Sequence, residues 1–362
     1  MAFNLIIGNE SFTPAQLQQQ HVAEQEMWQP YQHAALTFVQ QWLNNQQAFT
    51  VHTSGSTGKP KPIAVSRSRM QASARLTLQA LQLTAGTPAL LCINPAYIGG
   101  KMMLVRAMEG GLPIRLLSPE ANPLKQLPVA EQPLFTALVP LQLEAILQDM
   151  PSLKILNQMK SAIIGGAAVS PALEEKTQLV HAPLYSTYGM TETVSHIALR
   201  QINGPGRKDY FTVLPGIQIS TDGRGCLVIN GPVVEEEVVT NDIVELLDEN
   251  SFRWLGRIDN IVNTGGVKVQ AEQLEAVAMV CLREQGHGRR VLAGGLPDEK
   301  LGQKVVLLLE GEPLMAESVA VLLQCLTASL PKYWAPKEIL YVSNFVESDN
   351  GKIKRKETWA RL

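Results

Sequence analysis

The sequence has few cysteines, and they form no pattern. Only four occur among 362 residues, far apart and without a Cys-x-x-Cys spacing: Cys92, Cys226, Cys281 and Cys325. This distribution argues against a disulfide framework and against a structural zinc site. We therefore expect buried or incidental thiols in a reducing cytosol.

An excess of one charge and long apolar runs are also missing. With 31 basic and 33 acidic residues the net charge is −2, so the chain offers no broad attraction to nucleic acid or to an anionic membrane. No run approaches the roughly 18 apolar residues of a membrane span, and residues 1–7 lack the basic and apolar regions of a secretion signal. We expect a cytoplasmic protein with small-molecule partners, no nucleic acid and no membrane; a homodimer stays open.

Helix and strand patterns alternate through the first half of the chain. Apolar spacing predicts helices at 31–44, 66–83, 99–109, 141–150 and 171–179, and strands at 49–52, 87–93, 112–117, 133–139, 160–164 and 183–186. Such alternation implies βαβ units and a mainly parallel sheet, with ligands beyond the carboxyl ends of its strands.

The second half has a different pattern. Short β-like runs with Gly and Pro predict a β-rich subdomain from about 195 to 254. Beyond it, helices are predicted at 271–284 and 315–330, and strands at 290–294, 303–310 and 338–342. The 362 residues exceed the roughly 250–300 at which one hydrophobic core stops growing. We expect an α/β fold with a large N-terminal domain at 1–256, and a small mobile α+β domain at 257–362.

The most informative stretch joins hydroxyl, glycine and lysine residues directly after the strand predicted at 49–52. It runs Thr53, Ser54, Gly55, Ser56, Thr57, Gly58, Lys59, Pro60 and Lys61. Glycine lets the backbone approach a polyphosphate, hydroxyls donate hydrogen bonds, and lysines neutralise charge. The spacing is not that of a Walker A loop. The stretch predicts a nucleotide-phosphate loop rather than a flexible Gly/Ser linker.

Further short stretches carry candidate chemistry. They are Gly165-Gly166-Ala167 after a strand, the run from Tyr188 to Thr193, Asn241-Asp242, the run from Trp254 to Asp259, and Gly351-Lys352. An aromatic can stack on a base, and a glutamate such as Glu192 can hold a hard cation beside phosphates. Taken singly, a tight turn or a solvated charge explains each of them as well.

In this order and spacing, from about residue 49 to 356, the motifs resemble the ANL adenylating superfamily of acyl-CoA synthetases, luciferases and peptide-synthetase adenylation domains. Residues 188–199 and 258–269 are similar to the o-succinylbenzoate–CoA ligase family of menaquinone biosynthesis. The resemblance implies that an acid is adenylated with ATP and Mg²⁺ and then transferred to coenzyme A. Most relatives carry a longer N-terminal lobe, so we expect an adenylation domain truncated at its start.

The resemblance also implies roles for single residues. The loop from Thr53 to Lys59 would hold the β- and γ-phosphates, Glu192 the Mg²⁺, and Thr191 would touch the α-phosphate. The remaining nucleotide contacts would come from Gly165, Gly166, Ala167, Tyr188 and Gly189 around adenine and from Asp242 and Arg257 on the ribose. Lys352 would bridge the carboxylate and ribose oxygens during adenylation. Asp259 lies at the hinge position, and Gly265, Gly266 and Lys268 would line the coenzyme A tunnel.

The acyl pocket follows from the same resemblance. Residues 94–101 correspond to the substrate-gating loop, which brings Tyr97, Gly99 and Lys101 toward the acid. An aromatic keto-dicarboxylate has a second carboxylate that must be held. The candidates for that contact are Lys101, Arg106, Ser195 and His196. An exposed charge or a satisfied polar neighbour is an equally good explanation for each.

Other functions stay open at this point. The acid could be a different aryl or short-chain acid, which a panel of acids would tell apart. A nucleotide-binding regulator without catalysis would be favoured if Lys352 or Glu192 were missing, and both are present. A nucleic-acid binder is disfavoured because no basic stripe interleaved with aromatics occurs.

Replacing Lys352 with alanine is expected to separate the two half-reactions. A cationic contact formed mainly in the transition state contributes about 3–4 kcal/mol, or two to three decades in rate. We therefore predict that Lys352→Ala loses adenylate formation, measured as pyrophosphate release, but still transfers a supplied acyl-adenylate to coenzyme A. Equal losses in both half-reactions would contradict this division.

Overall fold

A computed structural model describes residues 3–19, 27–52, 62–127, 132–347 and 353–362. The chain divides into two compact units. The first comprises Met1–Val169, Lys176–Gln218 and Ile229–Val238, and the second Ser170–Glu175, Ile219–Val228 and Val239–Leu362. The boundary at 256 and 257 stays a prediction.

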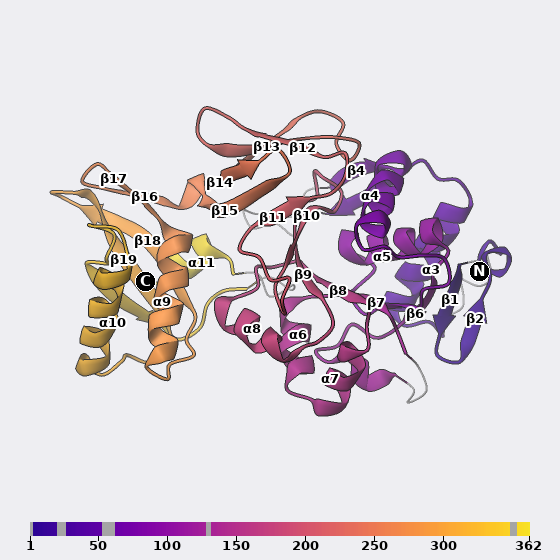
Figure 1. The fold of residues 1–362 in the computed structure, drawn as a ribbon, viewed down its shortest axis with the longest axis horizontal. Coiled ribbons are helices and arrows are strands. Elements are labelled where there is room, and N and C mark those ends of the chain that lie inside the picture. The colour runs from indigo at the N-terminus through magenta and orange to yellow at the C-terminus, as the bar shows by residue number, and fades with distance from the viewer. Residues whose placement is uncertain (1–2, 20–26, 53–61, 128–131, 348–352) are drawn as a thin grey trace. The chain divides into compact units, whose positions relative to one another are not determined.

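A mixed sheet forms the centre of the first unit (Figure 1). Its parallel strands are, in spatial order, β9 (Leu184–Gly189), β8 (Ser161–Ile164), β7 (Phe135–Leu138), β5 (Ala89–Leu91), β6 (Pro113–Leu116) and β1 (Asn4–Ile7). Antiparallel strands flank them: β2 (Glu10–Phe12) next to β1, and β10 (His196–Gln201) with β11 (Phe211–Val213) next to β9. Every residue of β5, β7 and β8 is buried, as expected of strands covered on both faces. The predicted, mainly parallel sheet is confirmed.

Helices alternate with these strands. The chain forms α1 (Pro14–Leu17), α3 (Pro30–Leu43), α4 (Arg67–Ala80), α5 (Ile98–Gly110), α6 (Pro140–Leu147), α7 (Met150–Asn157) and α8 (Pro171–Lys176). The Ser66 side chain caps α4 by accepting from the Arg69 N–H, and α5 ends at Gly111, which adopts a left-handed conformation. Helices α4 and α5 pack against each other. Among the described residues, no helix is both long and apolar enough to cross a membrane.

A separate hairpin precedes α4. Strands β3 (Ala48–His52) and β4 (Pro62–Ser66) pair antiparallel, with His52 opposite Pro62. The predicted phosphate loop joins these two strands and lies outside the described residues. Its flanks are therefore held in a fixed register by the hairpin.

The sequence pattern missed several features of the first unit. Strand β1, which adds to the sheet beside β6, was not predicted, because four residues with alternating burial give too short a signal. The helix predicted at 141–150 also ends early. Asp149 caps a new helix, α7, by accepting a hydrogen bond from the Ser152 N–H.

The second unit contains the predicted α+β part and the later strands of the predicted β-rich part, whereas the earlier strands, β10 and β11, belong to the first unit. Strands β14 (Val238–Asp248) and β15 (Ser251–Arg257) form an antiparallel hairpin, with β13 (Cys226–Asn230) and β12 (Gln218–Thr221) continuing from β14. The other sheet has the order β17 (Val267–Gln270), β16 (Ile261–Thr264), β19 (Gly302–Glu310) and β18 (Val291–Asp298), and β20 (Glu338–Val342) pairs with β19. Its helices are α9 (Ala271–Glu284), α10 (Ala316–Ser329) and α11 (Arg355–Trp359). A core of aliphatic side chains, including Leu274, Leu307 and Leu322, joins this sheet to α9 and α10.

The expectation of thiols is wrong for two cysteines. Cys281 of α9 and Cys325 of α10 form a disulfide, with Cα atoms 6.0 Å apart. No local pattern marks this pair, because the two cysteines are 44 residues apart and lie on two helices that pack against each other only in the folded chain. Cys92 and Cys226 are free and buried, as expected.

Reduction of this disulfide is expected to destabilise the protein. The bond closes a loop with a sequence separation of 44 residues, for which chain entropy predicts about 4 kcal/mol. We predict that the denatured, non-reduced protein titrates two thiols rather than four, and that dithiothreitol lowers the urea midpoint.

The double variant Cys281→Ser/Cys325→Ser is the control, since its midpoint should not respond to dithiothreitol. Four titratable thiols in the non-reduced protein would contradict the prediction.

Candidate active site

The first group of predicted residues lies where β8 and β9 end. Gly165 directly follows β8, and its N–H donates to the Leu138 carbonyl at 3.0 Å. A Cβ at position 165 would lie 2.5 Å from the Thr187 hydroxyl oxygen of β9, so any other residue would have to displace this hydroxyl. Gly166 adopts φ +85° and is exposed, which leaves backbone open to a ligand at the carboxyl edge of the sheet.

Strand β9 carries the next predicted residues to the same edge. The ring of Tyr188 lies 5.7 Å from that of Phe211, centroid to centroid, and is half-buried. Gly189, the last residue of β9, is exposed and pairs with His196 of β10. A Cβ at Gly189 would collide with the Ser195 carbonyl, so the strand and the returning chain approach more closely than any other residue would allow.

The chain from Met190 to Ser195, which we call the Glu192 turn, reverses direction between β9 and β10. The Thr193 hydroxyl accepts from the Met190 N–H at 3.0 Å, and its single proton faces the Ser195 carbonyl at 2.8 Å and the Met190 carbonyl at 3.0 Å. Thr191 accepts the Val194 N–H through its carbonyl at 3.0 Å. The Glu192 residue itself is exposed.

A buried polar cluster follows the Glu192 turn. Arg106 of α5 is 1% exposed, and its Nη2 donates to Ser195 Oγ at 2.9 Å and to His196 Nδ1 at 3.5 Å. No carboxylate pairs with Arg106 in the part of the chain that the structure describes, and its Nε has no hydrogen-bond partner there. The structure therefore brings together three of the four candidates for the second carboxylate.

The partners of His196 indicate its protonation. The Thr77 hydroxyl donates to the Ser73 carbonyl at 3.1 Å, so it accepts from His196 Nε2 at 3.1 Å. His196 Nδ1 is then the bare nitrogen that faces Arg106. Burial, followed by the charge of Arg106, lowers the pKa of His196 well below 6.5, which makes the imidazole neutral. Burial lowers the pKa of Arg106 to about 9, so the guanidinium stays charged at neutral pH.

The fourth candidate, Lys101, is engaged elsewhere. Its ammonium donates to the carbonyls of Pro95 and Ala96 at 3.1 and 2.6 Å, and partial burial lowers its pKa. It therefore ties α5 to the loop before it. At the start of this helix, Tyr97 is the N-cap residue and is exposed, and a Cβ at Gly99 would lie 3.2 Å from the Ile93 side chain.

A second group of predicted residues lies in the second unit, on β14 and β15. Asp242 is buried and accepts from Trp254 Nε1 at 3.3 Å and from Arg257 Nη1 at 3.5 Å. Arg257 Nη2 donates to Asp259 at 2.8 Å, and this hydrogen bond lowers the pKa of the Asp259 carboxyl. The ribose candidates and the predicted hinge residue are thus joined by one guanidinium.

The predicted coenzyme A residues lie on the hairpin of β16 and β17. Gly265 and Gly266 form its turn with φ of +56° and +83°, and Lys268 of β17 is exposed opposite Asn263. The residues Thr53, Ser54, Gly55, Ser56, Thr57, Gly58, Lys59 and Lys352 lie outside the described residues. Within the described chain, no three His, Cys, Asp or Glu side chains form a metal-binding cluster.

Two contacts of this site were not predicted from the sequence. Thr77 and Arg69, both on α4, reach residues 119 and 123 positions later in the chain. No local motif marks them, since a threonine and an arginine on a helix usually serve packing and solvation.

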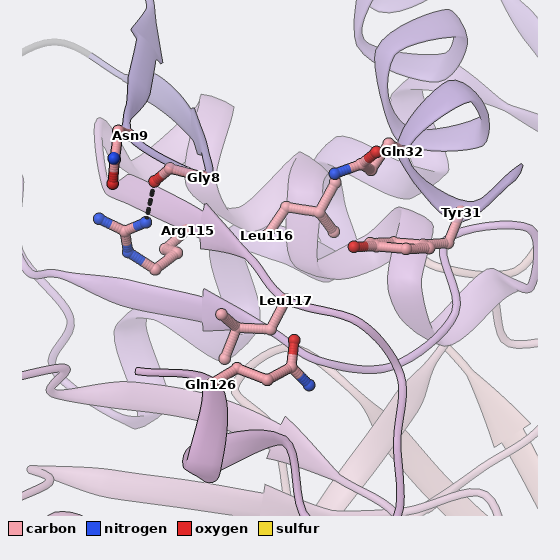
Figure 2. A pocket seen from close by; sticks show the side chains of 8 residues that line it. All are labelled: Gly8, Asn9, Tyr31, Gln32, Arg115, Leu116, Leu117 and Gln126. Carbon is pink, nitrogen blue, oxygen red and sulfur yellow. Dashed lines mark hydrogen bonds between the residues drawn. The ribbon is translucent and has the colours of Figure 1, made fainter. Parts of the chain in front are cut away.

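A cavity of about 230 Å³ lies elsewhere in the first unit, where β1 and β6 end (Figure 2). Arg115 of β6 donates to the Gly8 carbonyl at its rim, and Tyr31 and Gln32 line it from the first turn of α3. None of the predicted site residues lines this cavity.

The sequence of this chain is similar to those of known proteins. A model of the AMP-binding enzyme family matches residues 5–220. A probable 2-succinylbenzoate–CoA ligase of Mycobacterium tuberculosis is 27% identical over 347 residues, which cover 90% of this chain and 88% of that relative. The 2-succinylbenzoate–CoA ligase of Listeria monocytogenes is 25% identical, covering 89% and 71%.

The fold of this chain is also similar to those of solved structures. An acyl-CoA synthetase (AMP-forming)/AMP-acid ligase II-like protein of Dyadobacter fermentans is 39% identical, with a TM-score of 0.63, and covers 94% of this chain and 97% of its own. The o-succinylbenzoate coenzyme A synthetase of Bacillus subtilis, solved with ATP and a magnesium ion, is 20% identical with a TM-score of 0.68 and coverage of 86% and 69%. The latter likeness concerns the fold alone.

The buried, neutral His196 predicts a pH dependence of stability. Its folded pKa lies below its unfolded value, so only the unfolded state gains a proton as the pH falls below about 6.5. The stability is fully present above that pH and is lost below it, with a slope of up to about 1.4 kcal/mol per pH unit.

Urea unfolding between pH 5 and pH 8 measures this slope. His196→Gln keeps an acceptor for Arg106 and a donor for Thr77 but cannot titrate, so its slope below pH 6.5 should be smaller by that amount. Equal slopes in the two proteins would contradict a neutral, buried imidazole.

Proposed function

Since the chain belongs to the AMP-binding enzyme family and has its mixed α/β adenylation fold, we propose that it is an ATP-dependent, AMP-forming acid–CoA ligase whose acid is o-succinylbenzoate. One observation carries the choice of acid. The guanidinium of Arg106 is buried beside Ser195 without a carboxylate among the described residues. The curated 2-succinylbenzoate–CoA ligases to which the chain is similar support the same acid.

The first half-reaction joins two anions. An oxygen of the acid attacks the α-phosphorus of ATP, the bond to the β-phosphate oxygen breaks, and pyrophosphate leaves with the electron pair. Cations must stabilise the charge that builds up. We assign this to the loop from Thr53 to Lys59 on the β- and γ-phosphates and to Lys352 between the carboxylate and ribose oxygens. Thr191 contacts the α-phosphate.

Glu192 is the residue assigned to Mg²⁺. Its exposed carboxylate supplies the hard oxygen ligand that Mg²⁺ prefers, and Mg²⁺ sites commonly combine one or two carboxylates with substrate phosphates. When bound, the ion neutralises charge on the phosphate oxygens. The residues present therefore fit this metal.

The nucleoside contacts are assigned separately within each unit. Gly165, Gly166, Ala167, Tyr188 and Gly189 are assigned to adenine, where exposed glycine backbone and an aromatic ring suit a flat base. Asp242 and Arg257 are assigned to the ribose. Because Trp254 and Arg257 both donate to Asp242, its carboxylate is oriented before a hydroxyl donates to it.

Arg106 is assigned to the second carboxylate of the acid. A charge enclosed by neutral partners costs several kcal/mol of desolvation, which a bound carboxylate offsets through charge-assisted hydrogen bonds. Ser195 and the bare Nδ1 of His196 orient the guanidinium. Tyr97, Gly99 and Lys101 would then shape the loop over the acid, with Lys101 holding the loop through Pro95 and Ala96.

The second half-reaction replaces AMP by coenzyme A. The thiolate sulfur attacks the acyl carbon, and AMP leaves with the electron pair of the broken C–O bond. We assign Asp259 to the hinge of a small C-terminal domain from residue 257, and Gly265, Gly266 and Lys268 to the surface that meets coenzyme A. The two adjacent glycines, both at positive φ, present backbone without side chains there.

The test of this function is AMP release by purified protein with MgATP, coenzyme A and each acid of a panel. We expect a strong preference for o-succinylbenzoate, with its coenzyme A thioester as product. Preference for a benzoate or a fatty acid would support acid–CoA ligase activity but contradict o-succinylbenzoate as the substrate. If no acid led to AMP release, the proposed ligase activity would be contradicted.

Arg106→Met is predicted to raise the Michaelis constant for o-succinylbenzoate about ten- to a hundredfold, because a hydrogen bond to a charged group contributes about 1.5–3 kcal/mol. The variant should fold, since it replaces a buried charge by an apolar side chain of similar length. The measurement is a steady-state comparison with a monocarboxylic analogue that lacks the second carboxylate.

The analogue should be used equally well by both proteins. A similar loss with both acids would show that Arg106 only supports the fold of the pocket. Thermal unfolding of the two proteins accompanies the assay.

A further inference from the structure

We propose that Arg69 of α4 is a positioning residue that fixes the Glu192 turn for the metal. The proposal rests on the proposed function, in which Glu192 holds Mg²⁺. All the residues that carry it belong to the first compact unit.

Arg69 joins α4 to two other segments, the Glu192 turn and residues 233–235. Its Nη2 donates to the Glu192 carbonyl at 2.5 Å, its Nε to the Val233 carbonyl at 2.8 Å, and its Nη1 pairs with the Glu235 carboxylate at 3.2 Å. The arginine side chain is only 12% exposed, whereas that of Glu235 is 69% exposed. The two backbone carbonyls are therefore the anchoring partners, and the ion pair to Glu235 lies at the solvent.

The turn that Arg69 grips is strained. Val194 has φ +67°, a left-handed conformation that a β-branched residue rarely adopts, and it is fully buried. Such a conformation persists only where surrounding contacts over-determine it, and it is typical of functional sites. Here the Thr193 hydroxyl holds the turn from inside, through Met190 and Ser195.

Arg69 is the contact that holds the turn from outside. The hydrogen bonds of the Thr193 hydroxyl go to the two ends of the turn, whereas the Glu192 carbonyl in its middle is bound by Arg69. Without that bond, the middle of the turn is free to relax the strain at Val194. The Glu192 carboxylate would then spend less time where the ion binds.

The residue type also matters. A guanidinium presents five donors in a rigid plane, which lets one side chain bind two carbonyls and a carboxylate at once. A lysine ammonium keeps the charge but cannot span the three acceptors in the same way. Arg69→Lys therefore tests geometry rather than charge.

The experiment compares Arg69→Lys with a control on the same helix, Arg67→Lys. Arg67 donates to the Trp42 carbonyl and stacks on the Trp42 ring, away from the Glu192 turn. Hydrogen–deuterium exchange follows the peptide that contains residues 190–195, whose Val194 and Ser195 amides are hydrogen-bonded within the turn. Magnesium dependence of AMP formation gives the functional readout.

For Arg69→Lys we expect at least tenfold faster exchange in this peptide and an approximately tenfold higher Mg²⁺ concentration at half-maximal rate. The Michaelis constant for the acid should stay within about twofold, because the Thr193 hydroxyl and the Ser195 N–H still hold the end of the turn that meets Arg106. Glu235→Gln should have a smaller effect, since both backbone bonds remain. For Arg67→Lys we expect neither change.

Unchanged exchange in Arg69→Lys, or an equal rise in Arg67→Lys, would overturn the proposal. Faster exchange with an unchanged Mg²⁺ dependence would overturn it as well. If the wild-type protein releases no AMP with any acid, the proposed function fails by itself. In that case the affinity for ATP, measured by calorimetry with and without Mg²⁺, replaces the rate of AMP formation as the readout. For the proposal to stand, Arg69→Lys must still reduce the gain in ATP affinity that Mg²⁺ provides.

Discussion

The constraint on which the site depends is a positive charge enclosed by neutral groups. Arg106 sits in the interior with a serine hydroxyl and a bare imidazole nitrogen as its partners. Keeping that charge buried requires His196 to be neutral, and Thr77 sets its tautomer by donating to Ser73 and accepting from His196. A chain of hydrogen bonds from α4 thus holds the guanidinium that we propose to bind an anion.

The Glu192 turn links this charge to the residues that we propose to bind the nucleotide. Gly189 permits the close approach of the returning chain, and Val194 supplies the left-handed residue that reverses it. The turn therefore places Glu192 and Ser195 three positions apart, with the first assigned to the metal and the second to the guanidinium. One short, strained segment therefore carries residues proposed for the metal and for the acid. Helix α4 contacts this segment directly through Arg69, and Thr77 of the same helix bonds to His196, the residue that follows the turn.

Local sequence patterns were sufficient to predict many of the helices and strands. The helix at 271–284 and the strand at 338–342 were predicted to the residue, because strong periodicity and turn residues bound them. Strand β1, the start of α7 and the pairing of Cys281 with Cys325 were missed, since each depends on partners distant in the chain. The site shows the same limit. Contiguous motifs marked Tyr188 and Glu192, and Arg106 appeared as one candidate among four, whereas the contacts of Arg69 and Thr77 form only on folding.

The account's central claim is that Arg106 receives the second carboxylate of the acid. A crystal structure with a non-hydrolysable analogue of the o-succinylbenzoyl-adenylate tests it most directly. The account predicts oxygens of that carboxylate at about 2.7–2.9 Å from Arg106 nitrogens, as in charge-assisted pairs. A carboxylate that lies in solvent or on Lys101, with Arg106 still bound only to Ser195 and His196, would contradict the claim.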